Sequence, residues 1–284
     1  MAVTYLNQTY SSQKHPVLEY IFNKYYTPGA QEIVFTLEDI SEGYAHCRQT
    51  DPSSNLKEPA SISNTILDLT RKASGIASRL PPSIYNLGFD LCKKTGKHPI
   101  TGKSLAGAFV YVGVGNTYNT WLIWSNNPRQ LIIDPRNIPV PVQAFLRCDE
   151  GALFSVIDYC NILSQAFPQF GPIMRVQNPM KWQPNEIDGF YIDHTGLNIF
   201  PIEAKALTTK DDINLIQLAG GIMTVISKFP AHATITINPI AAQMVQNGIL
   251  LGMFSPVTTS CSSYIPILID SVLISFTPQL NAWS

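Results

Sequence analysis

Two acidic residues and one lysine are the residues of this chain best suited to chemistry. Asp188, Glu203 and Lys205 lie within the segment NEIDGFYIDHTGLNIFPIEAKAL, residues 185–207. Two strands joined by a tight turn between His194 and Thr195 are expected to place Asp188 roughly opposite Pro201 and diagonal to Glu203. Side chains alternate between the faces of a strand, so Glu203 and Lys205 project the same way. We therefore expect the three charged groups to meet at one spot.

This combination suits metal-dependent hydrolysis of a phosphodiester. Asp188 and Glu203, helped by the backbone carbonyl of Ala204, can hold a hard divalent cation such as Mg²⁺, with Mn²⁺ as a substitute. The cation lowers the pKa of a bound water and neutralises charge on the phosphate. Lys205 would orient that water or stabilise the developing negative charge. The alternative is a solvent-facing hairpin with Glu203 and Lys205 as a surface pair, but the apolar residues on both sides of the pair favour a central strand, where charges are costly.

The elements that must position these residues lie in the second half of the chain. Hydrophobic periodicity predicts the following order: a helix over 150–166, strands over 174–176, 186–192 and 198–206, a helix over 211–228, and strands over 233–237 and 249–254. The predicted fold class is α/β (α+β with a mixed sheet), a central mixed β-sheet flanked by helices. We assign residues 146–284 to this catalytic core.

The first half is expected to be largely helical and to recognise DNA. Helices are predicted over 16–26, 36–46, 61–77 and 83–94, followed by a β-hairpin over 108–124. A proline-rich bend over 134–142 then suggests a boundary, so residues 1–145 are assigned to the N-terminal region.

Composition excludes several classes of protein. The chain has 284 residues, of which 45% are hydrophobic and 14% charged, with a net charge of −1, so a disordered chain or a coiled coil is a poor description. The apolar stretches are too short for a membrane span, and the N-terminus lacks a secretory signal, so we expect no membrane partner and a cytoplasmic location. Cysteines and histidines are scattered without metal-ligand spacing.

The basic residues are unevenly distributed. Residues 71–103 hold seven Lys and Arg against the single acid Asp90. Such a segment is either a surface that contacts phosphates or a solvated loop face with chance clustering. The candidate phosphate-contacting residues are Arg71, Lys72, Arg79, Lys93, Lys94, Lys97 and Lys103. Asn86, which lies nearby in the sequence, is a candidate for reading bases.

The residues I-D-G at 187–189 and P-I-E-A-K at 201–205 together resemble the core motif of the PD-(D/E)XK nuclease superfamily, to which most type II restriction endonucleases belong. In that motif Asp188 and Glu203 match the metal-binding acids and Lys205 the lysine. Ile187 stands where the family usually has proline. The resemblance covers roughly residues 146–255, including a strand–turn–strand segment over 238–254.

The resemblance also implies supporting residues. Gln217 on the following helix resembles the glutamine that many members place beside the site. An upstream helix often supplies a further acid, for which Glu150 and Asp158 are both candidates. Apart from the resemblance, either Glu186 or Glu150 is expected to lie with Gln217 around the metal ligands and to support them.

The function that the resemblance implies is that of a Mg²⁺-dependent endonuclease cutting double-stranded DNA at a specific sequence, as a type II restriction enzyme does. A palindromic target would imply a two-fold symmetric homodimer. Two alternatives stay open. One is a repair or recombination nuclease that recognises DNA structure, and the other is a non-catalytic DNA-binding protein with a nuclease-like fold.

Overall fold

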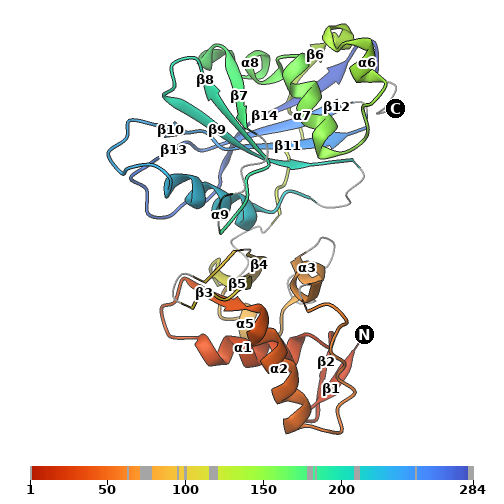
Figure 1. Cartoon of the computed structure of the whole chain (residues 1–284), viewed down its shortest axis with the longest axis vertical. Coiled ribbons are helices and arrows are strands. Elements are labelled where there is room, and N and C mark those ends of the chain that lie inside the picture. Colours follow the sequence, from red (N-terminus) through yellow and green to blue (C-terminus); the bar gives the residue numbers. More distant parts are fainter. Residues whose placement is uncertain are drawn as a thin grey trace. The chain divides into compact units, whose positions relative to one another are not determined.

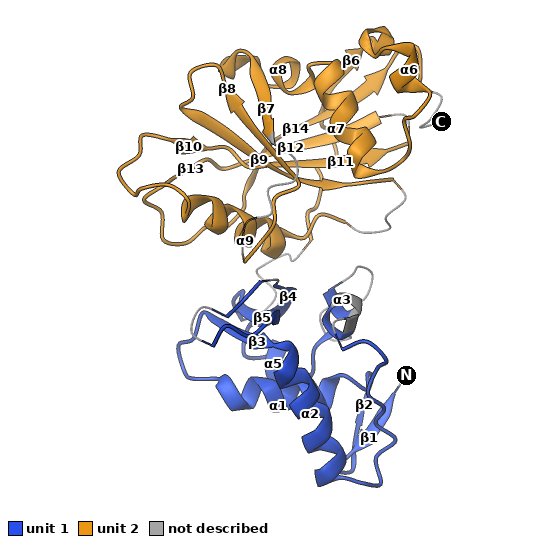
Figure 2. Cartoon of the chain, viewed as in Figure 1, with its two compact units in different colours: residues 1–120 blue, residues 121–284 orange. Residues whose placement is uncertain are grey.

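The chain divides into two compact units. In the computed structural model, residues 1–120 form one unit and residues 121–284 the other (Figures 1 and 2). The residues that the structure describes are 2–62, 64–70, 79–94, 96–98, 101–114, 121–177, 182, 184–207, 212–246 and 248–280. No helix within these residues is both long and apolar enough to cross a bilayer.

The described part of the first unit combines helices with two small antiparallel sheets. Its helices are α1 (His15–Tyr25), α2 (Leu37–Thr50), α3 (Asn64–Thr70) and α5 (Pro82–Tyr85), and its strands are β1 (Val3–Tyr5), β2 (Gln8–Tyr10), β3 (Glu32–Thr36), β4 (Phe89–Lys93) and β5 (Leu105–Tyr111). β1 pairs with β2, and β5 lies between β3 and β4. Helix α2 begins with a capping box, in which Thr36 and Asp39 each accept a hydrogen bond from the other's backbone N–H. The helices predicted over 16–26 and 36–46 are confirmed.

The expectation of a largely helical first half is wrong after residue 85, where strands β4 and β5 follow α5, and strands β1 to β3 lie among the helices before it. Of the helix predicted over 83–94, only the part within α5 is helical, because Gly88 adopts a φ of 88° and the chain then enters β4. Strand β4 is buried on both faces, so it lacks the polar–apolar alternation that marks a strand in sequence. Of the helix predicted over 61–77, α3 is described, and residues 71–78 lie outside the described part.

The β-hairpin predicted over 108–124 is also wrong. Strand β5 pairs with β3 and β4 rather than with the segment that follows it. Trp121 makes an isolated bridge with Asn214, within the second unit, and residues 115–120 lie outside the described part.

The second unit is built on one large mixed sheet. Its strands are β6 (Arg129–Ile133), β7 (Ile173–Gln177), β8 (Gly189–Asp193), β9 (Asn198–Lys205), β10 (Thr236–Ile237), β11 (Ile240–Val245), β12 (Gly248–Phe254), β13 (Val257–Thr258) and β14 (Leu268–Phe276). The order is β13-β10-β9-β11-β12-β14-β6, with β8 also paired to β9 and β7 to β8. Strand β9 runs antiparallel to β8 and parallel to β10 and β11, so it is central in the sheet.

Helices cover this sheet (Figure 1). They are α6 (Val140–Gln143), α7 (Glu150–Tyr159), α8 (Ile162–Ala166) and α9 (Leu215–Ile226), with short 3₁₀ turns η1 (Pro135–Asn137) and η2 (Pro168–Phe170). Leu153 of α7 shares one apolar core with Ile202 and Ala204 of β9. Because side chains alternate along β9, Glu203 faces the opposite side, where Leu218 of α9 lies. The mixed α/β sheet flanked by helices is thus confirmed.

Two details of the second unit differ from the sequence prediction. The boundary between the units lies at 120/121 rather than 145/146, because β6 pairs with β14 and Ile138 is buried in the core of the second unit. The helix predicted over 150–166 is divided into α7 and α8, because Asn161 adopts a left-handed φ of 48°.

Candidate active site

The β8–β9 hairpin brings Asp188 next to Glu203. Gly189 pairs with Ile202 and Phe190 with Pro201, so Asp188, one residue before Gly189, lies level with Glu203. The predicted register, with Asp188 opposite Pro201, is therefore wrong by two residues. The consequence is that the two carboxylates are closer neighbours than a diagonal pair.

The turn of the hairpin explains this register. Asp193 ends β8 as a buried acid, and its carboxylate accepts hydrogen bonds from the Asn198 backbone N–H at 3.2 Å and the Thr195 hydroxyl at 2.7 Å. Gly196 adopts a φ of 74° within the turn. These contacts centre the turn one residue later than the sequence predicted. Each residue of β8 is therefore paired with a residue of β9 that lies two positions later in the chain than predicted.

Asp188 is fixed to the edge of β9. The backbone N–H of Ala204 donates a 2.8 Å hydrogen bond to Asp188 Oδ2. The N–H and C=O of one residue point to the same side of a strand, so the Ala204 carbonyl leaves β9 on the side of Asp188. The Asp188 carboxylate and the Ala204 carbonyl, both expected to be cation ligands, therefore share one edge of the strand.

Two helices hold the segment that carries Asp188. A Cβ added to Gly189 would lie 2.4 Å from Cε1 of Phe154 on α7, so only glycine fits beneath that ring. On the other side Asn185 Nδ2 donates a 3.2 Å hydrogen bond to Thr224 Oγ1 of α9. The glycine of the I-D-G motif is thus explained by helix packing.

Glu203 and Lys205 form a buried ion pair. Lys205 Nζ lies 2.6 Å from Glu203 Oε1, and the two side chains are 14% and 5% exposed. The alternative of a solvent-facing surface pair is therefore wrong, because β9 is central in the sheet and α9 packs over this face. Lys205 projects on the same face as Glu203, as the alternation predicted.

The electrostatics of the site follow from burial and from its two acids. Burial, together with the nearby charge of Asp188, raises the pKa of Glu203 to about 7. Burial also raises the pKa of Asp188, although Lys205 and the Ala204 N–H oppose that shift. Burial alone would lower the pKa of Lys205, but the charges of Glu203 and Asp188 raise it above its ordinary value. Lys205 is therefore a cation at neutral pH, and one cation faces two acids.

The structure separates the two candidates for the upstream acid. The charge of Glu150, the first residue of α7, raises the pKa of both Glu203 and Lys205. Asp158 instead accepts a 2.8 Å hydrogen bond from Tyr191 Oη and pairs with Arg175 at 2.8 Å. Of the two candidates, Glu150 is therefore the acid whose charge acts on the site.

The remaining predicted site residues lie around this centre. Glu186 is exposed, and its charge raises the pKa of Asp188. Gln217 lies in the first turn of α9 and lines a small cavity together with Glu203 and Leu218. Asn214 starts α9 by accepting hydrogen bonds from the N–H groups of Ile216 and Gln217, which is why the helix begins after the predicted residue 211.

The donor atoms of this centre fit a hard divalent cation. Asp188 and Glu203 supply carboxylate oxygens. Burial raises the pKa of both, and the charge of Asp188 raises that of Glu203 further. A bound cation relieves the repulsion between the two carboxylates. Within the described ranges, no group of three or more His, Cys, Asp and Glu side chains is arranged to hold a metal ion. Mg²⁺ is commonly held by one or two carboxylates with waters and substrate phosphate oxygens, so the two acids suffice.

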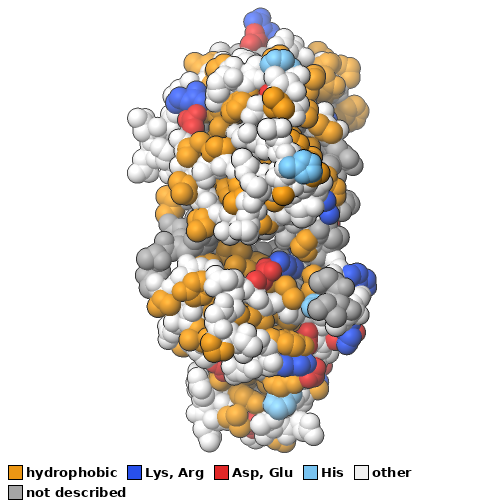
Figure 3. Space-filling view, turned by 90° about the vertical axis from the view of Figure 1, so that its left-hand side faces the viewer, with side chains coloured by type: hydrophobic (Ala, Val, Ile, Leu, Met, Phe, Trp, Pro, Cys, Tyr) orange, Lys and Arg blue, Asp and Glu red, His pale blue; other side chains and the backbone are white. Residues whose placement is uncertain are grey.

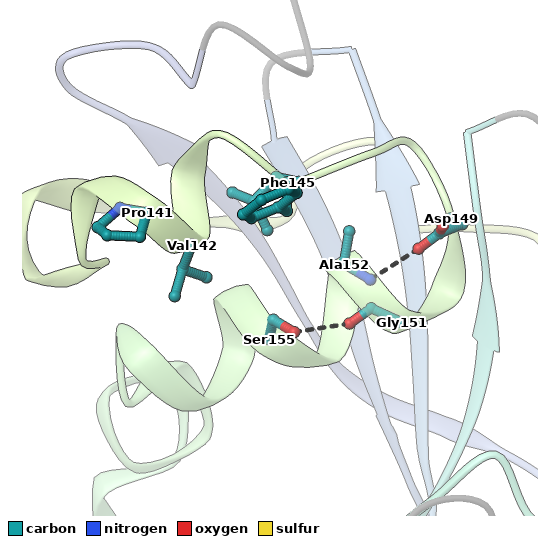
Figure 4. A pocket seen from close by; sticks show the side chains of 8 residues that line it. Pro141, Val142, Phe145, Asp149, Gly151, Ala152 and Ser155 are labelled. Carbon is teal, nitrogen blue, oxygen red and sulfur yellow. Dashed lines mark hydrogen bonds between the residues drawn. The ribbon is translucent and has the colours of Figure 1, made fainter.

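A hollow of about 500 Å³ lies beside the helix that carries Glu150. It opens between α6 and α7, with Phe145 and Val142 on one side (Figure 4). At its rim the Asp149 carboxylate caps α7 by accepting a 2.8 Å hydrogen bond from the Ala152 N–H. The sequence did not indicate this hollow. Asp149, which lines it, fixes the start of α7, where Glu150 lies.

The predicted DNA-contacting residues of the first unit have different surroundings. Arg79 is buried, with Nη1 2.9 Å from Oδ1 of the equally buried Asp90, so the prediction that it contacts phosphate is wrong. Lys94 pairs with Glu32, and Lys103 pairs with Glu38. Asn86, Lys93 and Lys97 are exposed, and Arg71 and Lys72 lie outside the described residues. Several basic side chains of the face in Figure 3 likewise lie beside acids.

Comparisons with known proteins do not identify the chain. No protein-family model matches the sequence, and neither a curated protein nor a solved structure matches it.

Proposed function

We propose that the chain is a Mg²⁺-dependent endonuclease that hydrolyses phosphodiester bonds in double-stranded DNA. The observation that carries the proposal is the convergence of Asp188, Glu203 and Lys205 at one buried end of the β8–β9 hairpin. Two carboxylates and one lysine beside a strand carbonyl are a set of groups that phosphodiester hydrolysis uses. An ordinary structural ion pair requires only one of the two acids.

Each residue has a distinct task in this proposal. Asp188, Glu203 and the Ala204 carbonyl would hold the cation, which when bound supplies an activated water and neutralises charge on the phosphate. Lys205, a cation at neutral pH, would orient the attacking water or stabilise charge on the non-bridging phosphate oxygens. Gln217 would help position groups on the Glu203 side, and Glu150 would adjust the local charge.

The order of elements supports the same proposal. A helix, an antiparallel β7–β8–β9 unit, a second helix and the parallel strand β11 follow one another around the site. This order fits a restriction-endonuclease-like core with one acid directly before the second strand and the other on the third. The fit covers α7 to β12 and leaves the first unit for contacts with DNA.

We further propose that the cleavage is sequence-specific and that the protein is a homodimer. A homodimer that reads a palindromic DNA sequence would place one active site on each of the two DNA strands. Light scattering after size-exclusion chromatography measures whether the protein is a dimer. A protein that recognises DNA structure needs no palindrome and no dimer.

Digestion of DNA tests the proposed function. Plasmid and phage DNA are incubated with the full chain in Mg²⁺ and in EDTA. Discrete fragments in Mg²⁺ alone are the expected result. Smears, or nicks confined to branched DNA, would indicate the structure-specific nuclease. Absence of cleavage on unmethylated, methylated and branched DNA, with DNA binding retained, would indicate the non-catalytic alternative.

A further inference from the structure

A glutamine on strand β11 lies directly beside Lys205. Strand β11 runs parallel to β9, and its register pairs Gln243 with Lys205. Ala204 and Ala242 belong to the apolar core on the α7 side, so Glu203, Lys205 and Gln243 project on the opposite face. Neighbouring strands lie about 4.8 Å apart, so Gln243 extends the polar row of the site by one strand.

Gln243 lies at the open end of this row. Lys205 is the last residue of β9, and Gln243 comes two residues before the end of β11 at Val245. Both side chains are partly exposed, whereas Glu203 and its neighbour Ala241 are buried. Ligands of α/β sheets bind outside the carboxyl ends of parallel strands. A substrate that approaches Lys205 from solvent therefore also meets Gln243.

Trp124 is held on the far side of Gln243. A Cβ added to Gly252 of β12 would lie 2.9 Å from Cζ3 of Trp124, so the indole ring packs directly on that glycine. The segment that carries Trp124 is tied to the start of α9, where the Leu122 N–H donates a 2.9 Å hydrogen bond to the Ile213 carbonyl. The ring is thus fixed over β12, the strand that flanks β11 on the side away from β9.

This tryptophan sets the direction of the Gln243 amide. Trp124 Nε1 donates a 2.7 Å hydrogen bond to Gln243 Oε1. An indole N–H can only donate, so the amide oxygen faces Trp124 and the amide nitrogen points away from it, toward the β9 side. No acceptor within the described part of the chain pairs with Gln243 Nε2. Two N–H donors are therefore presented beside Lys205.

We infer that Gln243 donates a hydrogen bond to a non-bridging oxygen of the substrate phosphate, with Trp124 as the positioning residue that orients its amide. The inference rests on the proposed function, because it adds a substrate-binding residue to the same site. Glutamine side chains are common donors to phosphate. A neutral amide adds a donor beside Lys205 without burying a second positive charge, which would be costly. A purely structural contact with Trp124 would use only the amide oxygen.

Gln243→Glu separates phosphate binding from a structural contact. The carboxylate still accepts the Trp124 hydrogen bond, but it has no N–H to donate. Single-turnover cleavage in Mg²⁺ should slow by at least about tenfold, as expected for the loss of a hydrogen bond to a charged group, while the urea midpoint stays near that of wild type. Gln243→Met removes the donor without adding charge and should slow cleavage about 10–100-fold. Gln130→Glu is the control, because it adds the same charge at an exposed residue of β6, and its rate should stay within about twofold of wild type.

DNA affinity provides a second readout that does not require cleavage. Fluorescence anisotropy of a labelled duplex is measured in Ca²⁺ and in EDTA. Gln243→Met should weaken binding at least about fivefold in Ca²⁺, where a cation can draw the phosphate into the site, and less than about twofold in EDTA. Trp124→Phe keeps a ring on Gly252 but removes the N–H that orients the amide, so it should slow cleavage less than either Gln243 variant does.

The outcomes are distinct. Wild-type rates for folded Gln243→Glu and Gln243→Met overturn the inference and leave the proposed function intact. A loss confined to Trp124→Phe, together with a lower unfolding free energy, makes the hydrogen bond a structural contact and also overturns the inference. If wild type cleaves no DNA, the proposed function fails. The affinities in Ca²⁺ then decide the inference, because weaker binding by Gln243→Met keeps the phosphate contact and equal binding overturns it.

Discussion

The backbone N–H of Ala204 donates a 2.8 Å hydrogen bond to the carboxylate of Asp188. This bond joins the residue that precedes β8 to the strand that carries Glu203 and Lys205. It also fixes one carboxylate oxygen of Asp188, so that the other oxygen and the Ala204 carbonyl share the edge of β9. The site is thus held together by the backbone of the motif as well as by its side chains.

Cation binding should strengthen as the pH rises through 7. The pKa of Glu203 is raised to about 7 by burial and by Asp188, so protons compete with the cation below that value. The apparent affinity for Mn²⁺ or Mg²⁺ should fall about tenfold for each pH unit below 7. Calorimetric titration at pH 6 and pH 8 measures this, with Asp158→Asn as a control that keeps the same dependence. Equal affinities at the two pH values would contradict the proposed role of Glu203.

The cation-free protein should lose stability over the same range. The pKa of Glu203 in the folded state lies above its ordinary value of 4.5, so the folded state binds the proton more tightly than the unfolded state. The stabilisation that this preferential proton binding gives the folded state is complete below pH 4.5 and is lost as the pH rises through 7. Urea unfolding in EDTA should show a larger fall in unfolding free energy between pH 5 and 8 for wild type than for Glu203→Gln. The reverse order would show that the carboxyl is not protonated when folded.

Replacing Lys205 should slow the chemical step without weakening DNA binding. Lys205→Met removes the charge 2.6 Å from Glu203 Oε1 but keeps most of the side-chain volume. Single-turnover cleavage should slow by about 10²–10³-fold, as for other donors that stabilise transition-state charge. DNA affinity in EDTA should stay within about threefold of wild type. A matched loss in affinity and rate would make Lys205 a simple DNA contact.

Substitutions of Glu150 and Asp158 should affect different properties, the first the pH dependence of cleavage and the second the stability of the fold. Glu150→Gln removes a charge that raises the pKa of Glu203 and Lys205, so it should shift the pH dependence of cleavage to lower pH with little change in stability. Asp158→Asn weakens the contacts with Tyr191 and Arg175 and should cost about 1–3 kcal/mol of unfolding free energy. Cleavage by the folded Asp158→Asn protein should keep its pH profile. Exchange of the two phenotypes would reassign the upstream acid.

Arg79 should prove to be a structural residue. Arg79→Ala removes the guanidinium that pairs with the buried Asp90, and breaking a buried ion pair costs about 3–5 kcal/mol. Chemical denaturation measures the loss, and the salt slope of DNA binding at a temperature where the variant is folded should be that of wild type. A stable variant with a reduced salt slope would restore Arg79 as a phosphate contact.

The sequence predicted the site better than it predicted the surrounding structure. Alternation along β9 was sufficient to put Glu203 and Lys205 on one face, because that rule depends only on a strand being present. The register of the hairpin could not be predicted, since it depends on side-chain hydrogen bonds made by Asp193 within the turn. Choosing Glu150 over Asp158 required the three-dimensional structure, in which Asp158 is engaged by Tyr191 and the charge of Glu150 reaches Glu203.

The first unit shows a different limit. Residues 83–94 have helical spacing, yet Gly88 and the buried pair of Asp90 with Arg79 belong to a strand edge and a core that only tertiary packing defines. The number of Lys and Arg residues over 71–103 likewise does not indicate which of them form ion pairs with acids. Acids distant in sequence, Glu32 and Glu38, pair with Lys94 and Lys103.

The most direct test compares Glu203→Gln with wild type in a Mg²⁺-dependent cleavage assay. Glutamine keeps the size of the side chain but removes the carboxylate, and Asp158→Asn serves as the matched control at an acid outside the site. Circular dichroism and DNA binding in EDTA establish that all three proteins are folded and bind the duplex. We predict at least about 10³-fold slower cleavage by Glu203→Gln and a rate near wild type for Asp158→Asn. Cleavage by folded Glu203→Gln at the wild-type rate would contradict the assignment of this centre as the active site.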